Sequence, residues 1–250
     1  MLREGTRVGT SFFVHTTNRY LVSAAHVAEW TTDKTAVVVW SEGDRPLTFE
    51  LRELVGPSGV KWIALGSHDL AVLKLDSSTA AEQLTRRFLP TSMFATVESA
   101  PKREYSLTVL GFPVGLGTAG HFSPLSLKTK AASGLLTLPR PDLISAAKRR
   151  LDEAKTHSDR VEALAALQRA KARTAAFFAT QDPSIGGYSG APVFDLKEGM
   201  MGTSRMTLRS GPPEVVGVVD ATISDDTGGK LGLIIPAAYV LQAIQKAEGN

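Results

Sequence analysis

The chain has 250 residues, of which 43% are hydrophobic, and it contains no cysteine, which excludes disulfide scaffolds, thiol nucleophiles and cysteine-ligated zinc. The formal charge is only +3, and residues 140–173 carry nine Lys/Arg against five Asp/Glu, so the rest of the chain is close to neutral and no nucleic-acid partner is expected. No apolar run approaches the roughly 20 residues of a membrane span, so no membrane partner is expected either.

The first third of the chain is predicted to form short β-strands. Arg, His and Asn interrupt its first apolar runs, unlike a signal peptide, so we expect a cytoplasmic location. Runs rich in β-branched and aromatic residues alternate with turn residues, without a helical pattern between them, which favours an antiparallel barrel or sandwich. The predicted strands lie at residues 7–16, 19–27, 35–40, 47–54, 61–66 and 70–76.

Residues 77–103 lack this strand pattern and are interpreted as a connector. A second β-rich region follows it and ends in a predicted helix at about 236–247, which begins at Pro236. We therefore expect one domain at 1–88 and a second at 89–250. The predicted strands of the second domain lie at 104–112, 125–138, 175–181, 191–196, 214–224 and 230–236.

A helical insertion is predicted at about 141–174, inside the second β-rich region. This segment is rich in alanine and charged residues, and its apolar residues recur at three- and four-residue spacing. Thr156 and Asp159 fit a capping box at the start of a helix. The pattern indicates two helices, or one bent helix.

The stretch SIGGYSGAPVF surrounds Ser189 with residues that have little side chain. Glycines supply tight turns, but they also leave backbone N–H groups free to hold an oxyanion beside a nucleophilic serine. Such a serine needs a base, and all five histidines precede Ser189. The order serine, acid, histidine of α/β-hydrolases is therefore excluded. The order aspartate, histidine, serine fails for His26, because no aspartate precedes it.

The order histidine, aspartate, serine remains, with His26 in SAAHV, Asp69 in HDLAVLKL and Ser189 in GYSGAPVF. These three motifs, in this order, resemble the signatures of trypsin-like serine proteases, and GTSFFV, GFPVGLG and ASGLLTL extend the likeness. The HtrA-type protease domain is the most similar branch. The resemblance implies an all-β fold of two six-stranded antiparallel β-barrels, the helical insertion lying in the second barrel, and a C-terminal helix.

By the same resemblance, His26 is the general base, Asp69 orients it and Ser189 attacks the scissile carbonyl of a protein or peptide substrate. The backbone N–H groups of Gly187 and Ser189 would form the oxyanion hole. No cofactor and no metal is expected. The residues expected to line the substrate pocket are Ser184, Ile185, Asp220, Ala221 and Thr222. For Asp220 two roles stay open, which are support of His26 and Asp69 or a charge near the pocket.

The sequence also permits other interpretations of the function and of single motifs. The runner-up function is a catalytically silent or switchable protease-like domain that binds proteins. The helical insertion lies where HtrA-type proteases relay partner binding, so a regulatory protein partner is expected there. GLGTAG at 115–120 matches the dinucleotide fingerprint, but no helix follows it, so a turn is expected. The remaining histidines are interpreted as ordinary exposed or hydrogen-bonded residues, with His68 at the surface or beside the site; they are His15, His68, His121 and His157.

Overall fold

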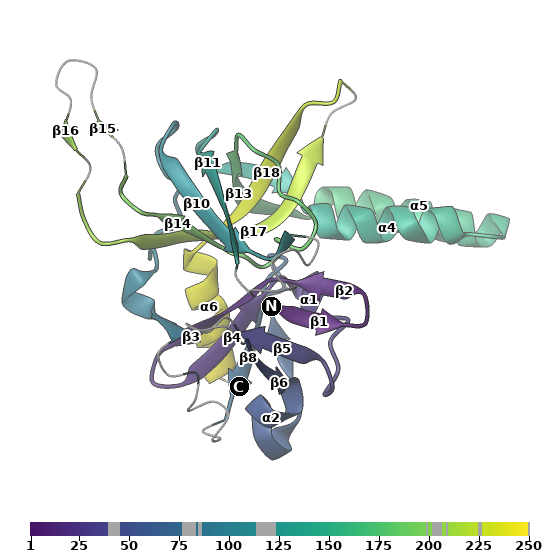
Figure 1. The fold of residues 1–250 in the computed structure, drawn as a ribbon. Coiled ribbons are helices and arrows are strands. Elements are labelled where there is room, and N and C mark those ends of the chain that lie inside the picture. The colour runs from purple at the N-terminus through teal and green to yellow at the C-terminus, as the bar shows by residue number, and fades with distance from the viewer. Residues whose placement is uncertain are drawn as a thin grey trace.

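The protein is mostly β-structure with few helices in the computed structural model, which confirms the all-β class (Figure 1). The structure describes residues 1–39, 46–76, 84, 87–113, 124–198, 200–201, 207–208, 210–224 and 227–249. GLGTAG and His121 lie outside these residues.

The first half of the chain forms two sheets. One has four strands in the order β2-β1-β5-β6, and the other has five in the order β7-β8-β4-β3-β9. Strands β3 and β9 pair in parallel, whereas an antiparallel barrel of six strands was expected. The bounds are β1 Leu2–Glu4, β2 Arg7–Gly9, β3 Ser11–His15, β4 Arg19–Ser23, β5 Ala36–Val39, β6 Leu47–Glu50, β7 Trp62–Ala64, β8 Ala71–Leu75 and β9 Phe88–Pro90.

The second half of the chain forms a seven-stranded sheet in the order β11-β10-β14-β17-β18-β13-β12, and β15 and β16 pair separately. The pairs within this sheet are antiparallel, as expected for the second barrel. The bounds are β10 Ser106–Gly111, β11 Leu125–Lys130, β12 Leu136–Pro139, β13 Thr174–Thr180, β14 Pro192–Asp195, β15 Met200–Met201, β16 Thr207–Leu208, β17 Glu214–Ser224 and β18 Lys230–Pro236.

The strand predicted at 47–54 ends at Glu50 and continues as helix α2, Leu51–Val55. The Glu50 backbone N–H donates to Glu53 Oε2 at 2.5 Å, which caps the helix start. Leu51, Leu54 and Val55 are buried at helical spacing. The short alternating pattern thus concealed a change of period from two to 3.6 residues.

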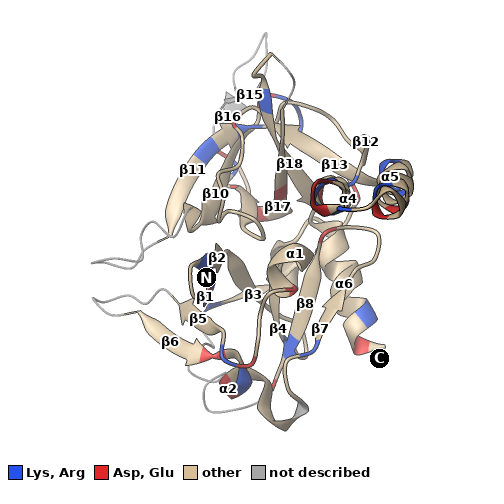
Figure 2. Ribbon diagram, turned by 90° about the vertical axis from the view of Figure 1, so that its right-hand side faces the viewer, with Lys and Arg blue, Asp and Glu red and all other residues tan. Residues whose placement is uncertain are grey.

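The helical insertion is confirmed, and of the two alternatives the structure contains two helices, α4, Pro141–Glu153, and α5, His157–Ala172. Thr156 Oγ1 accepts the Asp159 backbone N–H at 3.1 Å, and Asp159 Oδ2 accepts the Thr156 N–H at 3.1 Å, so the predicted capping box forms. The two helices pack on each other and project from the body of the molecule (Figure 1). Both carry acidic and basic side chains (Figure 2).

The C-terminal helix α6, Ala238–Glu248, begins two residues after Pro236 and packs against β7 and β8 of the first half (Figure 2). A single hydrophobic cluster therefore includes residues of both halves, among them Val72, Val218 and Ile244. In the described ranges, the other short helices are α1, Ala25–Ala28, and two 3₁₀ turns at Gly56–Ser58 and Thr91–Met93. Within the described residues, none of the helices has the length and apolar character needed to cross a membrane.

Candidate active site

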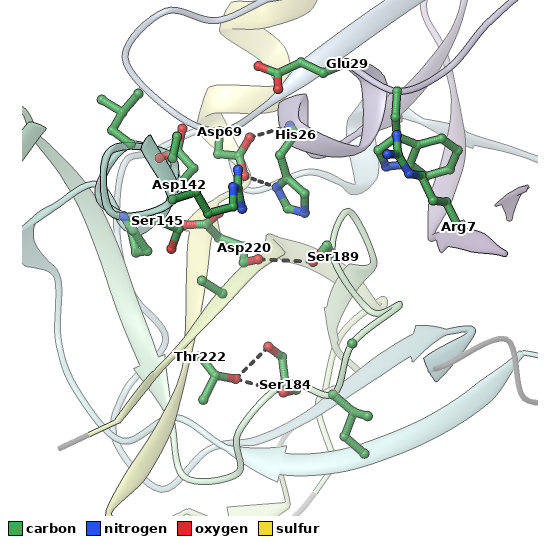
Figure 3. Close-up of a pocket in the computed structure, with 18 residues that line it drawn as sticks. Arg7, His26, Glu29, Asp69, Asp142, Ser145, Ser184, Ser189, Asp220 and Thr222 are labelled. Carbon is green, nitrogen blue, oxygen red and sulfur yellow. Dashed lines mark hydrogen bonds and ion pairs between the residues drawn. The ribbon is translucent and has the colours of Figure 1, made fainter. Parts of the chain in front are cut away.

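His26 and Asp69 lie beside the ends of two neighbouring strands of the five-stranded sheet. Strands β4 and β8 pair antiparallel, and Ser23 at the end of β4 lies opposite Ala71 at the start of β8. His26, in α1 after β4, and Asp69, in the turn before β8, therefore emerge at the same end of the sheet. Ser189 lies in the loop between β13 and β14 and lines the same cleft of about 880 Å³ as His26 and Asp69 (Figure 3).

The Asp69 carboxylate holds His26 at two points. His26 Nδ1 hydrogen-bonds Asp69 Oδ2, and the His26 backbone N–H donates to Asp69 Oδ1 at 2.8 Å. A carboxylate at Nδ1 places the proton on that nitrogen and leaves Nε2 as the free base. Asp69 is 2% exposed, whereas the His26 side chain is 43% exposed and opens onto the cleft.

The charges of this pair shift both pKa values. Burial lowers the pKa of His26, but the hydrogen bond and negative charge of Asp69 outweigh burial, so the net shift is upward from 6.5. Burial raises the pKa of Asp69, but the hydrogen bond and charge of His26 outweigh this effect, so the net shift is downward. Asp69 is thus the ionised partner, and it favours the protonated imidazole.

Ser189 faces the cleft without a hydrogen bond to His26 in this structure. Its hydroxyl donates to the Asp220 backbone carbonyl at 3.4 Å, and the His26 ring points toward the Ser189 loop (Figure 3). Among the described residues, the backbone N–H groups of Gly187 and Ser189 donate no hydrogen bond. Gly187 has φ 97°, and the Tyr188 N–H donates to the Ile185 carbonyl at 3.0 Å, as in a turn that needs glycine at its third position.

The loop around Ser189 fits closely against the first half of the chain. Gly190 has φ 84°, and a Cβ there would lie 2.4 Å from the Thr10 carbonyl oxygen and 2.8 Å from the Ala24 nitrogen. The Thr10 N–H donates to the Ser189 carbonyl at 3.1 Å, and Thr10 Oγ1 donates to the Gly187 carbonyl at 2.6 Å. The small residues around Ser189 thus permit a close backbone approach as well as turns.

Tyr188 anchors the other side of the loop. Its side chain is 3% exposed and belongs to the hydrophobic cluster of the second half. A Cβ at Gly111 would lie 2.6 Å from the Tyr188 ring. The side chain therefore lies in the core and leaves the cleft to Ser189.

All five residues predicted for the substrate pocket line the cleft. Ser184 and Thr222 face each other from its two walls, and their hydroxyl oxygens lie 2.9 Å apart (Figure 3). Thr222 Oγ1 also donates to the Ser184 carbonyl at 2.8 Å. Ile185 is 50% exposed at the rim. These two hydroxyls connect the walls below Ser189.

Asp220 differs from the other pocket residues because its carboxyl group is buried. The residue is 2% exposed, and among the residues that the structure describes, neither carboxyl oxygen has a donor group within hydrogen-bond distance. One ligand atom from each of Asp220, Asp69 and His26 lies within 4.8 Å of the others. Burial raises the pKa of Asp220 well above its ordinary value, and the charge of Asp69 raises it further.

Helix α4 forms a wall of the cleft that the sequence analysis did not predict. Asp142, Ser145 and Arg149 line the cavity from this helix. Its start is fixed by Arg140, whose guanidinium donates to Asp142 at 3.1 and 2.5 Å and to the Gly66 carbonyl at 2.6 Å. The base of the helical insertion is therefore attached to the turn that carries Asp69.

His68 is buried, in contrast to the surface position that was one of the two expected. It is 3% exposed and stacks on Tyr239 at 3.6 Å between ring centroids. Its Nε2 donates to the Ala176 carbonyl at 3.2 Å, and its Nδ1 accepts from Ser67 Oγ at 3.0 Å. Burial lowers the pKa of His68 to about 4. This neutral imidazole joins the turn of Asp69 to β13.

His26, Asp69 and Asp220 are also the one set among the described residues whose ligand atoms are close enough to share a metal ion. A cation there would have to displace the proton between His26 and Asp69. The hydrogen bonds already present are those expected of proton exchange rather than of metal coordination.

Thr10 and Arg140 were not predicted from the sequence as residues that support the site. A threonine beside a β-strand and an arginine before a helix are ordinary residues there, and only their partners, Gly187 and Gly66, mark them as important. The nearest signal for Thr10 is its place in GTSFFV, a motif that resembles the protease family but does not by itself assign a role to Thr10.

Comparison with known proteins agrees with this architecture. A family model described as a trypsin-like peptidase domain matches residues 9–202. A serine-to-alanine mutant of Rv3671c from M. tuberculosis H37Rv, inactive form, has a TM-score of 0.55 and 18% identity, covering 100% of this chain and 85% of that chain. The Rv3671c protease, inactive form, has a TM-score of 0.51 and 18% identity, covering 98% and 86%. At this identity the two structures establish likeness of fold. A search of curated proteins found no match.

Proposed function

We propose how this chain, which belongs to the trypsin-like peptidase family and is a serine endopeptidase, carries out its reaction. Ser189 is the nucleophile, His26 is the general base, and Asp69 is the residue that orients His26. The observation that carries the proposal is the pair of hydrogen bonds between Asp69 and His26, which leaves Nε2 of His26 free on the cleft side. The substrate is a protein or peptide chain bound in the cleft.

In the first step, His26 Nε2 takes the proton of Ser189 while Oγ attacks the scissile carbonyl carbon. The carbonyl oxygen becomes an oxyanion that accepts hydrogen bonds from the Gly187 and Ser189 N–H groups, which donate to no other group in the described ranges. His26 then protonates the leaving amine, and the acyl-enzyme forms. Water, deprotonated by His26, hydrolyses the ester and restores Ser189. Asp69 remains ionised and stabilises the imidazolium throughout.

We propose a small, uncharged side chain before the scissile bond. The hydroxyls of Ser184 and Thr222 hydrogen-bond across the pocket and tie its two walls together, which favours a small side chain between them. Neither Asp220 nor Asp182 offers a charge to a basic side chain, because the Asp220 carboxyl is buried and Asp182 does not line the cleft.

We propose that the helical insertion positions substrate with α4 and offers its outer end to a regulatory protein partner. Arg140 links the base of α4 to the turn of Asp69, which gives a partner bound at the outer end a route to the active site. Val161 and Leu164 on α5 are 54% and 49% exposed. We also propose that the chain divides into two domains. Residues 1–88 form the first, which carries His26 and Asp69, and residues 89–250 form the second, which carries Ser189.

The mechanism is tested by labelling with a serine-directed phosphonate. Ser189→Ala should abolish labelling and reduce kcat on the order of 10⁵–10⁶-fold. Ser99→Ala, a matched change at an exposed serine outside the cleft, should keep both the labelling and kcat. Labelling that survives in Ser189→Ala would identify a different nucleophile. Sequencing the cut ends of a digested peptide pool then gives the residue preferred before the scissile bond.

A second candidate function is a switchable protease-like domain, favoured by the hydrogen bond of Ser189 Oγ to the Asp220 carbonyl instead of His26. In unliganded proteases this contact is often long and tightens only with substrate. A labelling rate that rises when a non-cleavable peptide is present would support the switchable form. A constant rate would support the constitutive enzyme.

The insertion is tested by replacing residues 150–160 with a short glycine-rich turn, which keeps the cleft residues of α4. We expect unchanged cleavage of short peptides and altered cleavage of unfolded protein substrates. A docking role would be contradicted if the replacement changed neither the rate of peptide cleavage nor the rate of protein cleavage.

A further inference from the structure

Asp220 occupies a singular position on β17. The pairing of β17 with β18 shifts between Val219 and Ala221, so Asp220 is the extra residue of a β-bulge. Bulges redirect a side chain and commonly lie beside active sites. Here the bulge directs a carboxyl group into the interior, toward Asp69 and His26, while the Asp220 carbonyl accepts the Ser189 hydroxyl.

An ionised Asp220 would be a buried charge without compensation. Within the described part of the chain, neither of its oxygens has a donor group at hydrogen-bond distance. The charged groups that act on it are the carboxylates of Asp69 and Asp142, the guanidinium of Arg140 and the imidazole of His26. Arg140 is already bonded to Asp142 and to the Gly66 carbonyl. His26 directs its Nδ1 to Asp69.

Two carboxyl groups this close in a buried site do not both ionise readily. Asp69 receives the hydrogen bonds of His26 and is the ionised member. The proton therefore belongs to Asp220, and a protonated carboxyl group is a hydrogen-bond donor. The nearby acceptor with a charge is the Asp69 carboxylate, and an interaction between the two carboxyl groups lowers the pKa of Asp69.

We propose that Asp220 is a neutral carboxylic acid that donates a hydrogen bond to Asp69, and that it thereby positions the Asp69–His26 pair. This inference rests on the proposed function, because it assigns Asp69 the task of orienting His26. Asp220 is a positioning residue, since it acts on His26 through Asp69. The absence of donor groups around its oxygens fits this state, because a neutral carboxyl group carries no charge that needs donors and its O–H is itself a donor.

The proton on Asp220 is tested without changing residue 220. Infrared spectra of protein carrying only Ser189→Ala, with ¹³C-labelled aspartate, should contain the C=O band of a protonated carboxyl group at pH 7. The band should disappear in the Ser189→Ala, Asp220→Asn double variant and persist in Ser189→Ala, Asp195→Asn. Asp195 is a matched control, because it is also buried but bonds to Lys197. Absence of the band at pH 7 would overturn the proposal.

The positioning role is tested by the NMR titration of His26 in the Ser189→Ala background. Asp220→Asn replaces one neutral donor with another, so the pKa of His26 should move by less than about 0.3 units. A fall of about one unit or more would mean that a charge was removed, and would overturn the proposal. In the active protein, Asp220→Asn should keep kcat/KM within about fivefold, and Asp220→Ala should lower it about 10- to 100-fold through kcat.

The two proposals fail in different ways. If Ser189 is not the nucleophile, phosphonate labelling survives in Ser189→Ala while the infrared band is still present. If Asp220 is ionised, the band is absent although Ser189→Ala abolishes labelling.

Discussion

Thr10 donates a hydrogen bond from Oγ1 to the carbonyl of Gly187 at 2.6 Å, across 177 positions of the chain. Its own backbone N–H donates to the Ser189 carbonyl at 3.1 Å. The loop that carries the proposed nucleophile and the proposed oxyanion donors is therefore held by the half of the molecule that contains His26. Correct docking of the two halves thus also orients the peptide groups of the active site.

Thr10→Val removes the hydroxyl but keeps the β-branched shape and the backbone bond to Ser189. Freed from its donor, the Gly187 carbonyl can rotate and misalign the neighbouring N–H groups. We expect kcat to fall about 10- to 100-fold, less than the ~10²–10³ that follows full loss of one oxyanion donor. Thr10→Ser should restore kcat, as measured with a short peptide substrate. A normal kcat in Thr10→Val would refute this role.

Gly190→Ala should destabilise the fold, because alanine there must adopt φ 84° and contact the backbone of Thr10 and Ala24. We expect the free energy of unfolding to fall by about 2–4 kcal/mol. Gly186→Ala is the matched control, since a Cβ there meets nothing within 4 Å. Denaturant unfolding of the two variants makes the comparison, and equal stabilities would contradict the packing argument.

Peptide cleavage should depend on pH through His26. The imidazole must be neutral to accept the Ser189 proton, and Asp69 raises its pKa above 6.5. We therefore expect kcat/KM to rise with pH and to reach half its maximum above pH 6.5. In Ser189→Ala protein the NMR titration of His26 should give the same midpoint, and Asp69→Asn should lower it. A midpoint below 6.5 in both measurements would contradict the assignment.

Acid should destabilise the fold through His68. Its pKa is about 4 in the folded protein and near 6.5 when unfolded, so the unfolded chain binds a proton first as the pH falls. Stability is lost between about pH 6.5 and 4, by roughly 2 kcal/mol already at pH 5. His68→Gln should remove this part of the difference in unfolding free energy between pH 7 and pH 5. His15→Gln is the control, and the same pH dependence in both variants would exclude His68.

Thr222→Ala should widen the specificity pocket, because it removes the hydroxyl bridge to Ser184. Cleavage after larger apolar residues should gain about 10-fold or more relative to cleavage after alanine, as expected for one or two methylene groups of added space. Thr222→Ser keeps the bridge and should keep the preference. Digests of one peptide pool by both variants give the comparison, and identical cut sites would remove the bridge from the specificity argument.

The order of the three candidate site residues and the all-β class were predicted from the sequence, because both depend on short, local sequence patterns. A serine among small residues, a histidine at the end of one strand and an aspartate at the head of another are visible without coordinates. The two helices of the insertion and the Thr156–Asp159 capping box were also predicted, since capping depends on residues three positions apart.

Some local patterns were less informative. The strand predicted at 47–54 becomes helix α2 after Glu50, because four to eight apolar residues fit either period. The parallel pairing of β3 with β9 was not predicted, since pairing partners depend on packing and not on local propensity.

By itself the sequence determined which residue types were available for acyl transfer and in which order they occur, because those are properties of the chain. Tertiary structure alone decided that Thr10 holds the Gly187 carbonyl, that α4 forms a wall of the cleft and that Asp220 is buried beside Asp69. The reason is physical, since hydrogen bonds and pKa shifts depend on distances of a few ångströms and on burial. Both arise only when distant segments pack together.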